Sequence, residues 1–268
     1  MQPITRLPPD ACRSLEGLVF DIDDTVTREG RLELVAFEAM HRLAAAGLRL
    51  LAVTGRPLGW ADVVAHHWPL AGAVGENGAG WVWCLPGAFR EGYFADAATR
   101  KASRRRLARI RDRVAADLPD IAVSADQRHR RCDLAFDIGE YHHVPVDRIA
   151  ALVEVIEDEG ARVTISSVHA HAVPGEWNKA AGAVRAGAEI LDADLDTDRD
   201  RWLFVGDSGN DAEAFAWFPL SVGVSNVREH LAGLASPPAY ITAGDRGCGF
   251  AELASAVLRH RGGSGGRS

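Results

Sequence analysis

Short apolar runs alternate with segments of helical periodicity in the first third of the chain. The runs GLVF, LRLLAV and AGAV begin at positions 17, 48 and 71, and the segments between them, near 34–46 and 59–67, carry apolar residues at helical spacing. Two parallel strands need a crossover connection, which is usually a helix. The alternation therefore predicts parallel strands joined by helices.

The same pattern returns at the other end of the chain. A helical segment starts at Lys179, the run WLFV starts at position 202, and a further helix is expected after Asp211. The run LSVGV, a helix near Val227 and a last helix near 250–259 follow. We expect both ends to build one α/β core with a doubly wound parallel sheet.

The middle of the chain has a different order of elements. It predicts a strand near Trp81, a long basic helix, strands near Ile121 and 132–138, a helix near 146–159, and strands within 162–173. Neighbouring strands with few crossovers indicate an antiparallel α+β module inserted into the sheet domain. We therefore expect a core of residues 1–81 and 176–260, an inserted domain of 82–175, and a flexible tail of 261–268.

Composition excludes several classes of protein. Apolar residues make up 47% and charged residues 25%, which is typical of a folded globular chain. The sequence has no uninterrupted apolar run of the roughly 18 residues that would suggest a membrane span, and charged residues stand where a signal peptide would need an apolar run. A cytoplasmic protein that binds no membrane is expected. The four scattered cysteines do not predict a zinc site.

Charge is distributed unevenly. The net charge of −7 disfavours nucleic-acid binding, although 100–113 holds eight basic residues. These residues form either a solvated helix face or a positive surface that steers anionic substrates. Segment 82–175 has 14 basic and 14 acidic residues, so the acidic excess belongs to the core.

Acidic residues follow two of the predicted core strands. LVFDIDDT places Asp21, Asp23 and Asp24 after an apolar run, and LFVGDSGND places Asp207 and Asp211 after another. In a doubly wound fold, ligands bind beyond the carboxyl ends of the strands. One acidic turn is as readily structural as functional, but two that meet would call for a hard cation such as Mg²⁺.

Two further positions offer groups that bind phosphate. Thr54, in LLAVTGR, follows a buried strand and presents a hydroxyl and backbone N–H groups, although alone it would be an ordinary turn. Asn178 can cap the helix whose first turn contains Lys179. A cation is unfavourable at a helix N-terminus unless it faces phosphate or carboxylates.

In this order, DIDDT, Thr54, Lys179 and GDSGND resemble the four motifs of the haloacid dehalogenase superfamily, whose core is a Rossmann-like sheet. The insertion after VGENGA resembles the α+β cap of the Cof-type, or IIB, branch. That branch contains sucrose-phosphate, trehalose-phosphate and mannosyl-3-phosphoglycerate phosphatases and phosphomannomutase, and VPGEWNK is similar to the mutase segment. Asp24 departs from the branch, which commonly has glycine there.

The resemblance implies a Mg²⁺-dependent phosphatase acting on a small phosphorylated metabolite, most favourably a sugar phosphate. Asp21 would be the nucleophile, and Asp23 the acid and base. Asp21, Asp207 and the backbone carbonyl of Asp23 would hold Mg²⁺. The resemblance further implies that Thr54, Gly55 and Lys179 bind the phosphate. Asn210 and Asp211 would contact the residues of the site and not the substrate, with Asp211 orienting Lys179 or a metal-bound water.

The cap would choose the substrate, because the core sees only the phosphoryl group. The candidates are polar residues of the inserted strands and loops: Arg128, Arg130, Arg131, Asp133, Asp137, Glu140, Ser166, Ser167, His169 and His171. Each fits a half-exposed strand equally well. His169 and His171 could also bind a metal from one strand face.

Two alternative functions remain open at this stage. One is phosphotransfer of the phosphomannomutase type, in which a second sugar hydroxyl takes the place of water. The other is a non-catalytic sensor of a phosphorylated metabolite, which the presence of Asp21, Asp23, Lys179 and Asp207 disfavours. The sequence fixes neither the exact substrate nor the oligomeric state.

Overall fold

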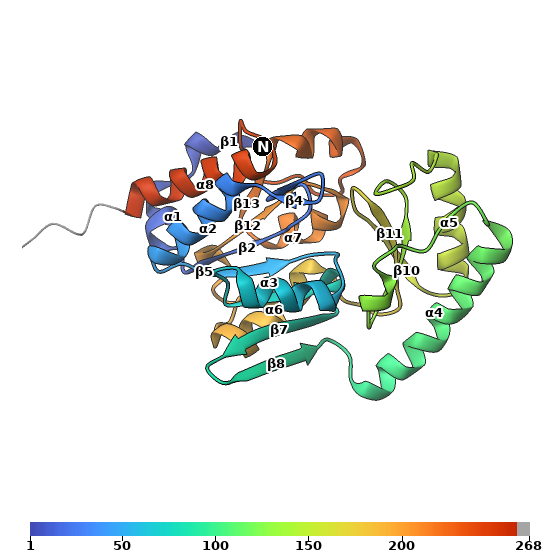
Figure 1. Cartoon of the computed structure of the whole chain (residues 1–268). Helices are drawn as coiled ribbons and strands as arrows, with labels where there is room; N and C mark the ends of the chain where they lie inside the picture. Colours follow the sequence, from blue (N-terminus) through green and yellow to red (C-terminus); the bar gives the residue numbers. More distant parts are fainter. Residues whose placement is uncertain (262–268) are drawn as a thin grey trace, which may run out of the picture.

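A computed structural model describes residues 1–261, which form a large α/β core and a smaller α+β part beside it (Figure 1). Within that range, the core sheet has nine strands in the order β1-β14-β13-β12-β2-β5-β6-β7-β8. The strands are β1 (Gln2–Pro3), β14 (Tyr240–Ile241), β13 (Leu220–Gly223), β12 (Trp202–Gly206), β2 (Gly17–Phe20), β5 (Arg49–Val53), β6 (Gly72–Gly75), β7 (Gly80–Leu85) and β8 (Ala88–Tyr93). Strand pairing is parallel from β1 to β6, as the alternating pattern predicts.

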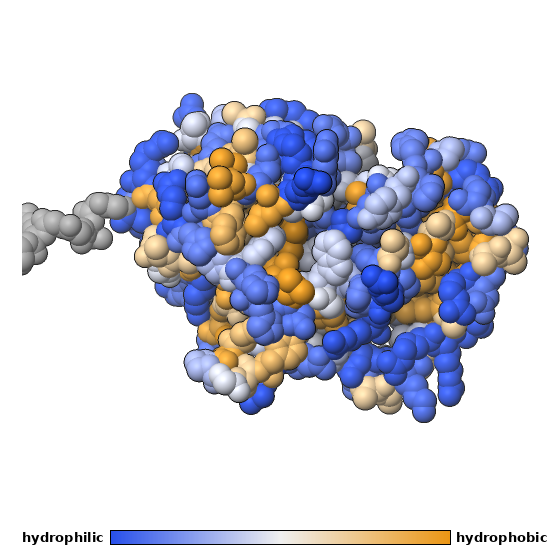
Figure 2. Space-filling model, viewed as in Figure 1, coloured by the Kyte–Doolittle hydropathy of each residue, from blue (hydrophilic) through white to orange (hydrophobic). Residues whose placement is uncertain are grey.

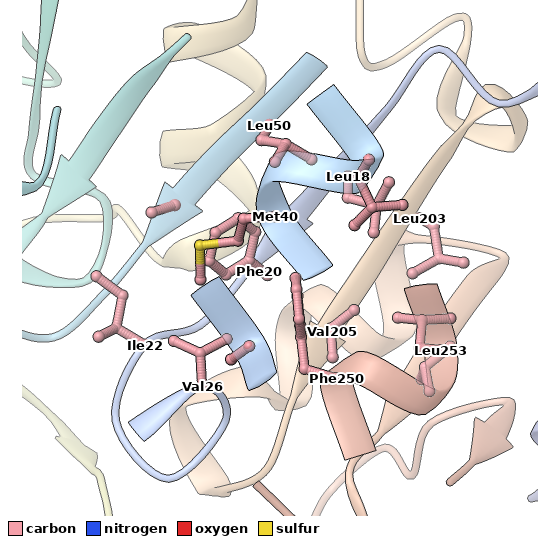
Figure 3. Packing of buried hydrophobic residues seen from close by; sticks show 14 of the residues in the cluster. Leu18, Phe20, Ile22, Val26, Met40, Leu50, Leu203, Val205, Phe250 and Leu253 are labelled. Carbon is pink, nitrogen blue, oxygen red and sulfur yellow. The ribbon is translucent and has the colours of Figure 1, made fainter. Parts of the chain in front are cut away.

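Helices cover both faces of this sheet, because successive side chains of each strand point to opposite sides. Leu18 and Phe20 belong to one apolar cluster and Val19 to the other. One layer consists of α1 (Pro9–Ser14), α2 (Leu34–Ala45), α3 (Leu58–His67) and α8 (Arg246–Arg261), and the opposite layer of α6 (Lys179–Leu191) and α7 (Ala212–Trp217). Figure 3 shows Phe20 of β2 beside Met40 of α2 and Phe250 of α8.

The inserted part is an antiparallel sheet backed by two helices, as predicted. Its strands are β9 (Leu134–Asp137), β10 (Arg162–Ile165) and β11 (His169–Val173), in the order β10-β11-β9. The helices α4 (Ala97–Asp117) and α5 (Val146–Asp158) pack on it through a third apolar cluster. The strand expected near Ile121 is reduced to a single bridge between Val123 and Phe136.

The predicted start of the inserted domain needs a correction. Strands β7 and β8 pair antiparallel with β6 and so extend the core sheet, whereas the sequence analysis placed residues 82–93 in the insertion. The chain reverses after β6 because Glu76, Asn77 and Gly78 all have positive φ, at 50°, 54° and 106°. The structure therefore separates the two parts after Tyr93.

Shorter elements complete the chain. A two-stranded hairpin, β3 (Thr27–Arg28) and β4 (Arg31–Leu32), turns at Glu29 and Gly30, both of which have positive φ. The 3₁₀ turns are η1 (Ile4–Arg6), η2 (Glu76–Gly78), η3 (Gln127–His129), η4 (Arg199–Arg201), η5 (Gly209–Asp211), η6 (Ser225–Glu229) and η7 (Leu231–Gly233). The helix predicted near Val227 is thus η6. The predicted flexible tail lies outside the described residues, except for Arg261.

In the part of the chain that the structure describes, no helix combines the length and the apolar character needed to cross a bilayer. The basic run at 100–113 lies on α4. Several of its arginines, including Arg109 and Arg113, form exposed ion pairs with acidic residues at the end of α5. These pairs fit a solvated helix face.

Candidate active site

The two acidic turns meet because their strands are neighbours. Phe20 of β2 and Val205 of β12 are register partners, and the Asp21 N–H donates to the Val205 carbonyl at 2.9 Å. Asp21 and Asp207 follow these strands and are both buried. The expectation that the strand ends bring the two carboxylates together is confirmed.

Lys179 joins them from the first turn of α6. Asn178 caps this helix by accepting a hydrogen bond from the Ala181 N–H at 2.9 Å. The Lys179 ammonium donates to Asp21 Oδ1 and Asp211 Oδ1, each at 2.6 Å. Burial alone would lower the pKa of Lys179, but these two carboxylates outweigh it and raise the pKa. The cation is therefore charged and fixed against the nucleophile candidate.

Asp211 supports this arrangement through both of its oxygens. Oδ1 binds Lys179, while Oδ2 accepts the backbone N–H groups of Asp207 and Ser208 at 2.9 and 3.1 Å. One oxygen each of Asp21, Asp207 and Asp211 lies within 4.8 Å of the others. Because both Asp211 oxygens are already engaged, its contacts fit the orienting role expected for it.

Asp21 Oδ2 and Asp207 Oδ1 share a single donor. Thr25 Oγ1 lies 3.3 Å from Asp21 Oδ2 and 3.5 Å from Asp207 Oδ1, and a hydroxyl has only one proton to give. Burial raises the pKa of Asp21 to about 7, against the attraction of Lys179. Burial, with Asp21 and Asp211 nearby, raises the pKa of Asp207 well above its ordinary value. Buried carboxylate oxygens short of a donor fit a hard divalent cation such as Mg²⁺.

The loop after β5 supplies the candidate phosphate ligands. Thr54 is buried, and its hydroxyl accepts the Arg56 N–H at 3.0 Å, which leaves the hydroxyl proton free to donate. A Cβ on Gly55 would lie 3.2 Å from Asn77 Oδ1 and 3.3 Å from His171 Nε2. Glycine therefore lets the backbone approach the site closely.

A small pocket of about 10 Å³ lies at Asp21. Core and cap residues line it together: Asp21, Asp23, Gly55, Arg56, Ser166, Ser167, Val168, His169, His171, Ser208 and Asn210. A larger cleft of about 610 Å³ adjoins it between the hairpin β3–β4, helix α3 and the cap loop 139–141. Figure 2 shows the indentation between the two parts, bordered mainly by hydrophilic residues. Asp23 and Arg56 line both spaces.

No protein-family model matches the sequence, and no curated protein sequence matches it. Solved structures do match. A protein of Thermoplasma acidophilum gives a TM-score of 0.68 at 17% identity, over 91% of this chain and 98% of that one. The sucrose-phosphatase of Synechocystis, in complex with sucrose and phosphate, gives a TM-score of 0.64 at 17% identity, over 92% of this chain and 98% of that one. A haloacid dehalogenase-like hydrolase from Bacteroides thetaiotaomicron gives a TM-score of 0.64 at 14% identity, over 91% of this chain and 99% of that one.

The chain shares its fold with solved structures that include members of the haloacid dehalogenase superfamily. Matches that cover nearly the whole chain include the inserted part, which confirms the predicted combination of a doubly wound core and an α+β cap. On this haloacid dehalogenase fold, the side chains of Asp21, Asp207 and Lys179 meet at strand ends and a helix start, and Thr54 follows the neighbouring strand β5.

The cap candidates fall into two groups on the haloacid dehalogenase fold. Ser166 and His169 line the pocket at Asp21, and so do Ser167 and His171. Of the others, Arg128 is exposed and donates to its neighbour His129. The β10–β11 hairpin thus lies at the pocket, whereas Arg128 does not line it.

Three further candidates are occupied by contacts within the protein. Arg130 is buried and donates to Asp126, to Asp133 and to the Gly55 carbonyl, the last at 2.8 Å. Arg131 binds the side chains of Glu91 and Tyr93 at the surface. Asp137 accepts the backbone N–H groups of residues 139, 140 and 141. Neither Arg130, Arg131 nor Asp137 lines the pocket at Asp21 or the adjoining cleft, and their substrate contacts stay a prediction.

His169 and His171 each face a carboxylate in the cap. His169 Nε2 lies 2.9 Å from Glu140 Oε2, and His171 Nδ1 lies 2.9 Å from Asp133 Oδ2. Burial lowers the pKa of His171 well below its ordinary value, so this ring is neutral at physiological pH. Its buried Nε2 has no hydrogen-bond partner among residues 1–261 and lies beside Gly55. Both rings thus present an edge to the pocket.

Two residues that the sequence analysis did not single out belong to the site. Arg56 is buried, and its guanidinium makes three hydrogen bonds of 2.8–3.0 Å to the Asp23 carboxylate. Asn226 Nδ2 donates at 3.0 Å to both Asp207 Oδ2 and the Asp24 carbonyl. Asn226 follows the strand LSVGV, so the strand-end argument applied to a third strand would have found it.

The departure at Asp24 has a structural explanation. Its φ is 55°, in the left-handed region that glycine adopts readily and aspartate tolerates better than most residues. Its side chain accepts the Arg246 Nε–H at 2.9 Å. The Asp24 carboxylate is therefore paired with Arg246.

Proposed function

We propose that this protein is a Mg²⁺-dependent phosphatase that hydrolyses a small phosphorylated metabolite through an aspartyl-phosphate on Asp21. The observation that carries the proposal is the pairing at Asp21: one oxygen binds Lys179 at 2.6 Å and the other shares a single hydroxyl proton with Asp207. Such a carboxylate is held for attack and needs a cation beside it. The phosphatases with the same fold support the reaction class.

The residues present fit Mg²⁺. Three buried carboxylates face one ammonium, so the cluster carries an excess of negative charge that a dication would balance. Asp21, Asp207 and the backbone carbonyl of Asp23 would hold the ion. When bound, it would keep Asp21 ionised and offset the charge of the phosphoryl oxygens.

The chain's own groups then divide the reaction between them. A carboxylate oxygen of Asp21 attacks phosphorus, and the bond from phosphorus to the leaving oxygen breaks. Asp23, which lines both the pocket and the cleft, gives its proton to that oxygen. Thr54, the Gly55 N–H and Lys179 hold the phosphoryl oxygens. In the second half, Asp23 takes a proton from the water that releases inorganic phosphate.

The cleft favours a polar leaving group, in keeping with a sugar phosphate. It is lined by charged and hydroxyl side chains together with the aromatic faces of Trp60 and Tyr141. Aromatic faces and polar groups are the combination that contacts the two kinds of surface on a sugar. The sucrose-phosphatase with a similar fold, which was solved with sucrose and phosphate, gives independent support.

Replacement of the nucleophile tests the proposal. Asp21→Asn should abolish phosphate release from p-nitrophenyl phosphate in the presence of Mg²⁺, while circular dichroism shows an unchanged fold. Asp10→Asn, at an exposed position, is the matched control and should keep full activity. Turnover retained in Asp21→Asn would rule out the assignment.

The same assay separates hydrolysis from phosphotransfer. With a hexose monophosphate as substrate, a phosphatase releases inorganic phosphate and leaves the free sugar. A mutase of the phosphomannomutase type would instead yield an isomeric sugar phosphate. Binding of the sugar phosphate without either product would indicate the sensor function.

A further inference from the structure

The cap reaches the proton-transfer residue through one arginine. Arg56 belongs to the core loop after β5, yet its guanidinium binds both Asp23 of the core and Glu140 of the cap. Nε and Nη2 donate to the Asp23 carboxylate, and Nη1 donates to Glu140 Oε1 at 2.8 Å. The Arg56 side chain is only 5% exposed, so these contacts are shielded from water.

Each neighbour of the guanidinium restricts its orientation. The Trp60 ring lies 4.8 Å from the guanidinium carbon, which gives a cation–π contact on one face. Asp126 of the cap lies 3.7 Å from Nη1. A planar fork held by three carboxylates and one ring has little freedom to rotate. Asp23, bound by that fork, is therefore fixed as well.

Glu140 is itself held in position by the cap. Its N–H donates to Asp137 Oδ1 at 2.8 Å, so Asp137 orders the loop that carries it. Its second oxygen, Oε2, lies 2.9 Å from His169 Nε2. All of these partners except Arg56 belong to the cap, so Glu140 leaves Arg56 whenever the cap moves away from the core.

We propose that Glu140 is a positioning residue that makes proton transfer by Asp23 depend on the closed cap, acting through Arg56. The inference rests on the phosphatase function proposed above. With the cap closed, Glu140 and Asp23 clamp the guanidinium from two sides and the Asp23 carboxyl faces the leaving oxygen. With the cap away, Arg56 loses its hydrogen-bonded partner Glu140 and the more distant Asp126, and Asp23 loses its fixed orientation.

The test uses two substrates of similar size whose leaving groups differ in acidity. p-Nitrophenol leaves readily as an anion, whereas benzyl alcohol must be protonated as it leaves. General acid catalysis contributes about 10²–10⁴-fold where the leaving group needs a proton. For Glu140→Gln we expect kcat/KM to fall roughly 10- to 100-fold on benzyl phosphate and less than about threefold on p-nitrophenyl phosphate.

Glu159→Gln is the matched control, because Glu159 forms ion pairs with Arg109 and Arg113 on the outer helices of the same cap. Glu159→Gln should leave kcat/KM unchanged with both substrates. A double-mutant cycle with Arg56→Lys adds a second readout: if Glu140 acts through Arg56, the loss from Glu140→Gln should largely vanish in that background. Lysine keeps the charge but not the fork.

Three outcomes would overturn the inference. Equal losses on both substrates would mean that Glu140 only stabilises the closed cap. A change confined to KM would mean that it contacts the leaving group directly, and additive losses in the cycle would mean that it acts without Arg56. If the unaltered protein released phosphate from neither substrate, the proposed function would fail, which is a different result from any of these.

Discussion

The carboxylate cluster of the core and the junction between core and cap both bury acidic residues. The two regions differ in how many hydrogen-bond donors the buried carboxylate oxygens have. At the junction, Glu76 Oε1 accepts the Leu58 and Arg131 N–H groups, and Oε2 accepts those of Cys132 and Asp133. In the core, oxygens of Asp21 and Asp207 share one hydroxyl proton. Both Glu76 oxygens are fully hydrogen-bonded within the protein, whereas the core cluster is built to receive a ligand.

This difference follows from what each region has to do. Hydrogen bonds that are all made within the protein fix one geometry, which suits a surface where two domains meet. A buried carboxylate short of a donor costs stability in the folded protein. That cost is acceptable where a cation and a phosphoryl group complete the site. Mutations should therefore affect catalysis most in the core and domain docking most at the junction.

The largest effect is expected at Lys179. Replacing it with methionine keeps the length of the side chain but removes the cation between Asp21 and Asp211. A lost charge that stabilises the transition state costs about 10²–10³-fold, and here the nucleophile also loses its fixed partner. We expect kcat with p-nitrophenyl phosphate and Mg²⁺ to fall by at least about 10³-fold.

The exposed Lys101→Met on α4 is the control for this variant and should keep its activity. The melting temperature should be measured in parallel, since removing the cation leaves like charges together. Loss of less than about tenfold in Lys179→Met would contradict the comparison, because the core cluster would then not depend on its cation.

The next effect is expected at Glu76, in the junction. Each Glu76 oxygen accepts two backbone N–H groups, so Glu76→Gln sets an NH₂ group against two donors whichever oxygen it replaces. Each buried donor left unsatisfied costs about 1–3 kcal/mol. We expect kcat/KM for a hexose phosphate to fall about tenfold, because the cap docks less often on the core.

Glu91→Gln provides the matched control, since Glu91 binds the Arg131 side chain at the exposed end of the same contact. Limited proteolysis should show faster cleavage between core and cap in Glu76→Gln only. Unchanged kinetics with unchanged proteolysis would show that the junction is not held by Glu76.

Much of the core could be predicted from the sequence because local rules decide it. Strand-end acids must meet when parallel strands are neighbours, and that rule brought Asp21 and Asp207 together. Lys179 was recognisable because it stands at a helix start, where a cation is otherwise unfavourable. Both arguments need only the order of elements, which the alternating pattern provides.

The cap junction could not be predicted in the same way. Arg130 and Arg131 have similar sequence surroundings, yet one is buried against the core loop and the other lies at the surface. Arg56 and Glu140 are 84 residues apart, and only the folded structure shows that they are paired. The pairing of β7 with β6 depends on positive φ at Glu76 and Asn77. Because neither residue is a glycine, the sequence carries no signal for this reversal, and residues 82–93 therefore read as part of the insertion.

The smallest effect is a dependence of stability on both Mg²⁺ and pH. Without a cation, burial raises the pKa of Asp21 to about 7, above the roughly 3.9 of an unfolded chain. The folded protein then holds a proton that the unfolded chain has lost, so stability falls as pH rises from about 4 to 7. Mg²⁺ requires the ionised carboxylates and competes with that proton.

Added Mg²⁺ should therefore raise the melting temperature by a few degrees more at pH 8 than at pH 5.5. Asp207→Asn should remove most of this difference, whereas Glu76→Gln, at the junction, should retain it. An equal Mg²⁺ effect at both pH values would place the ion away from Asp21.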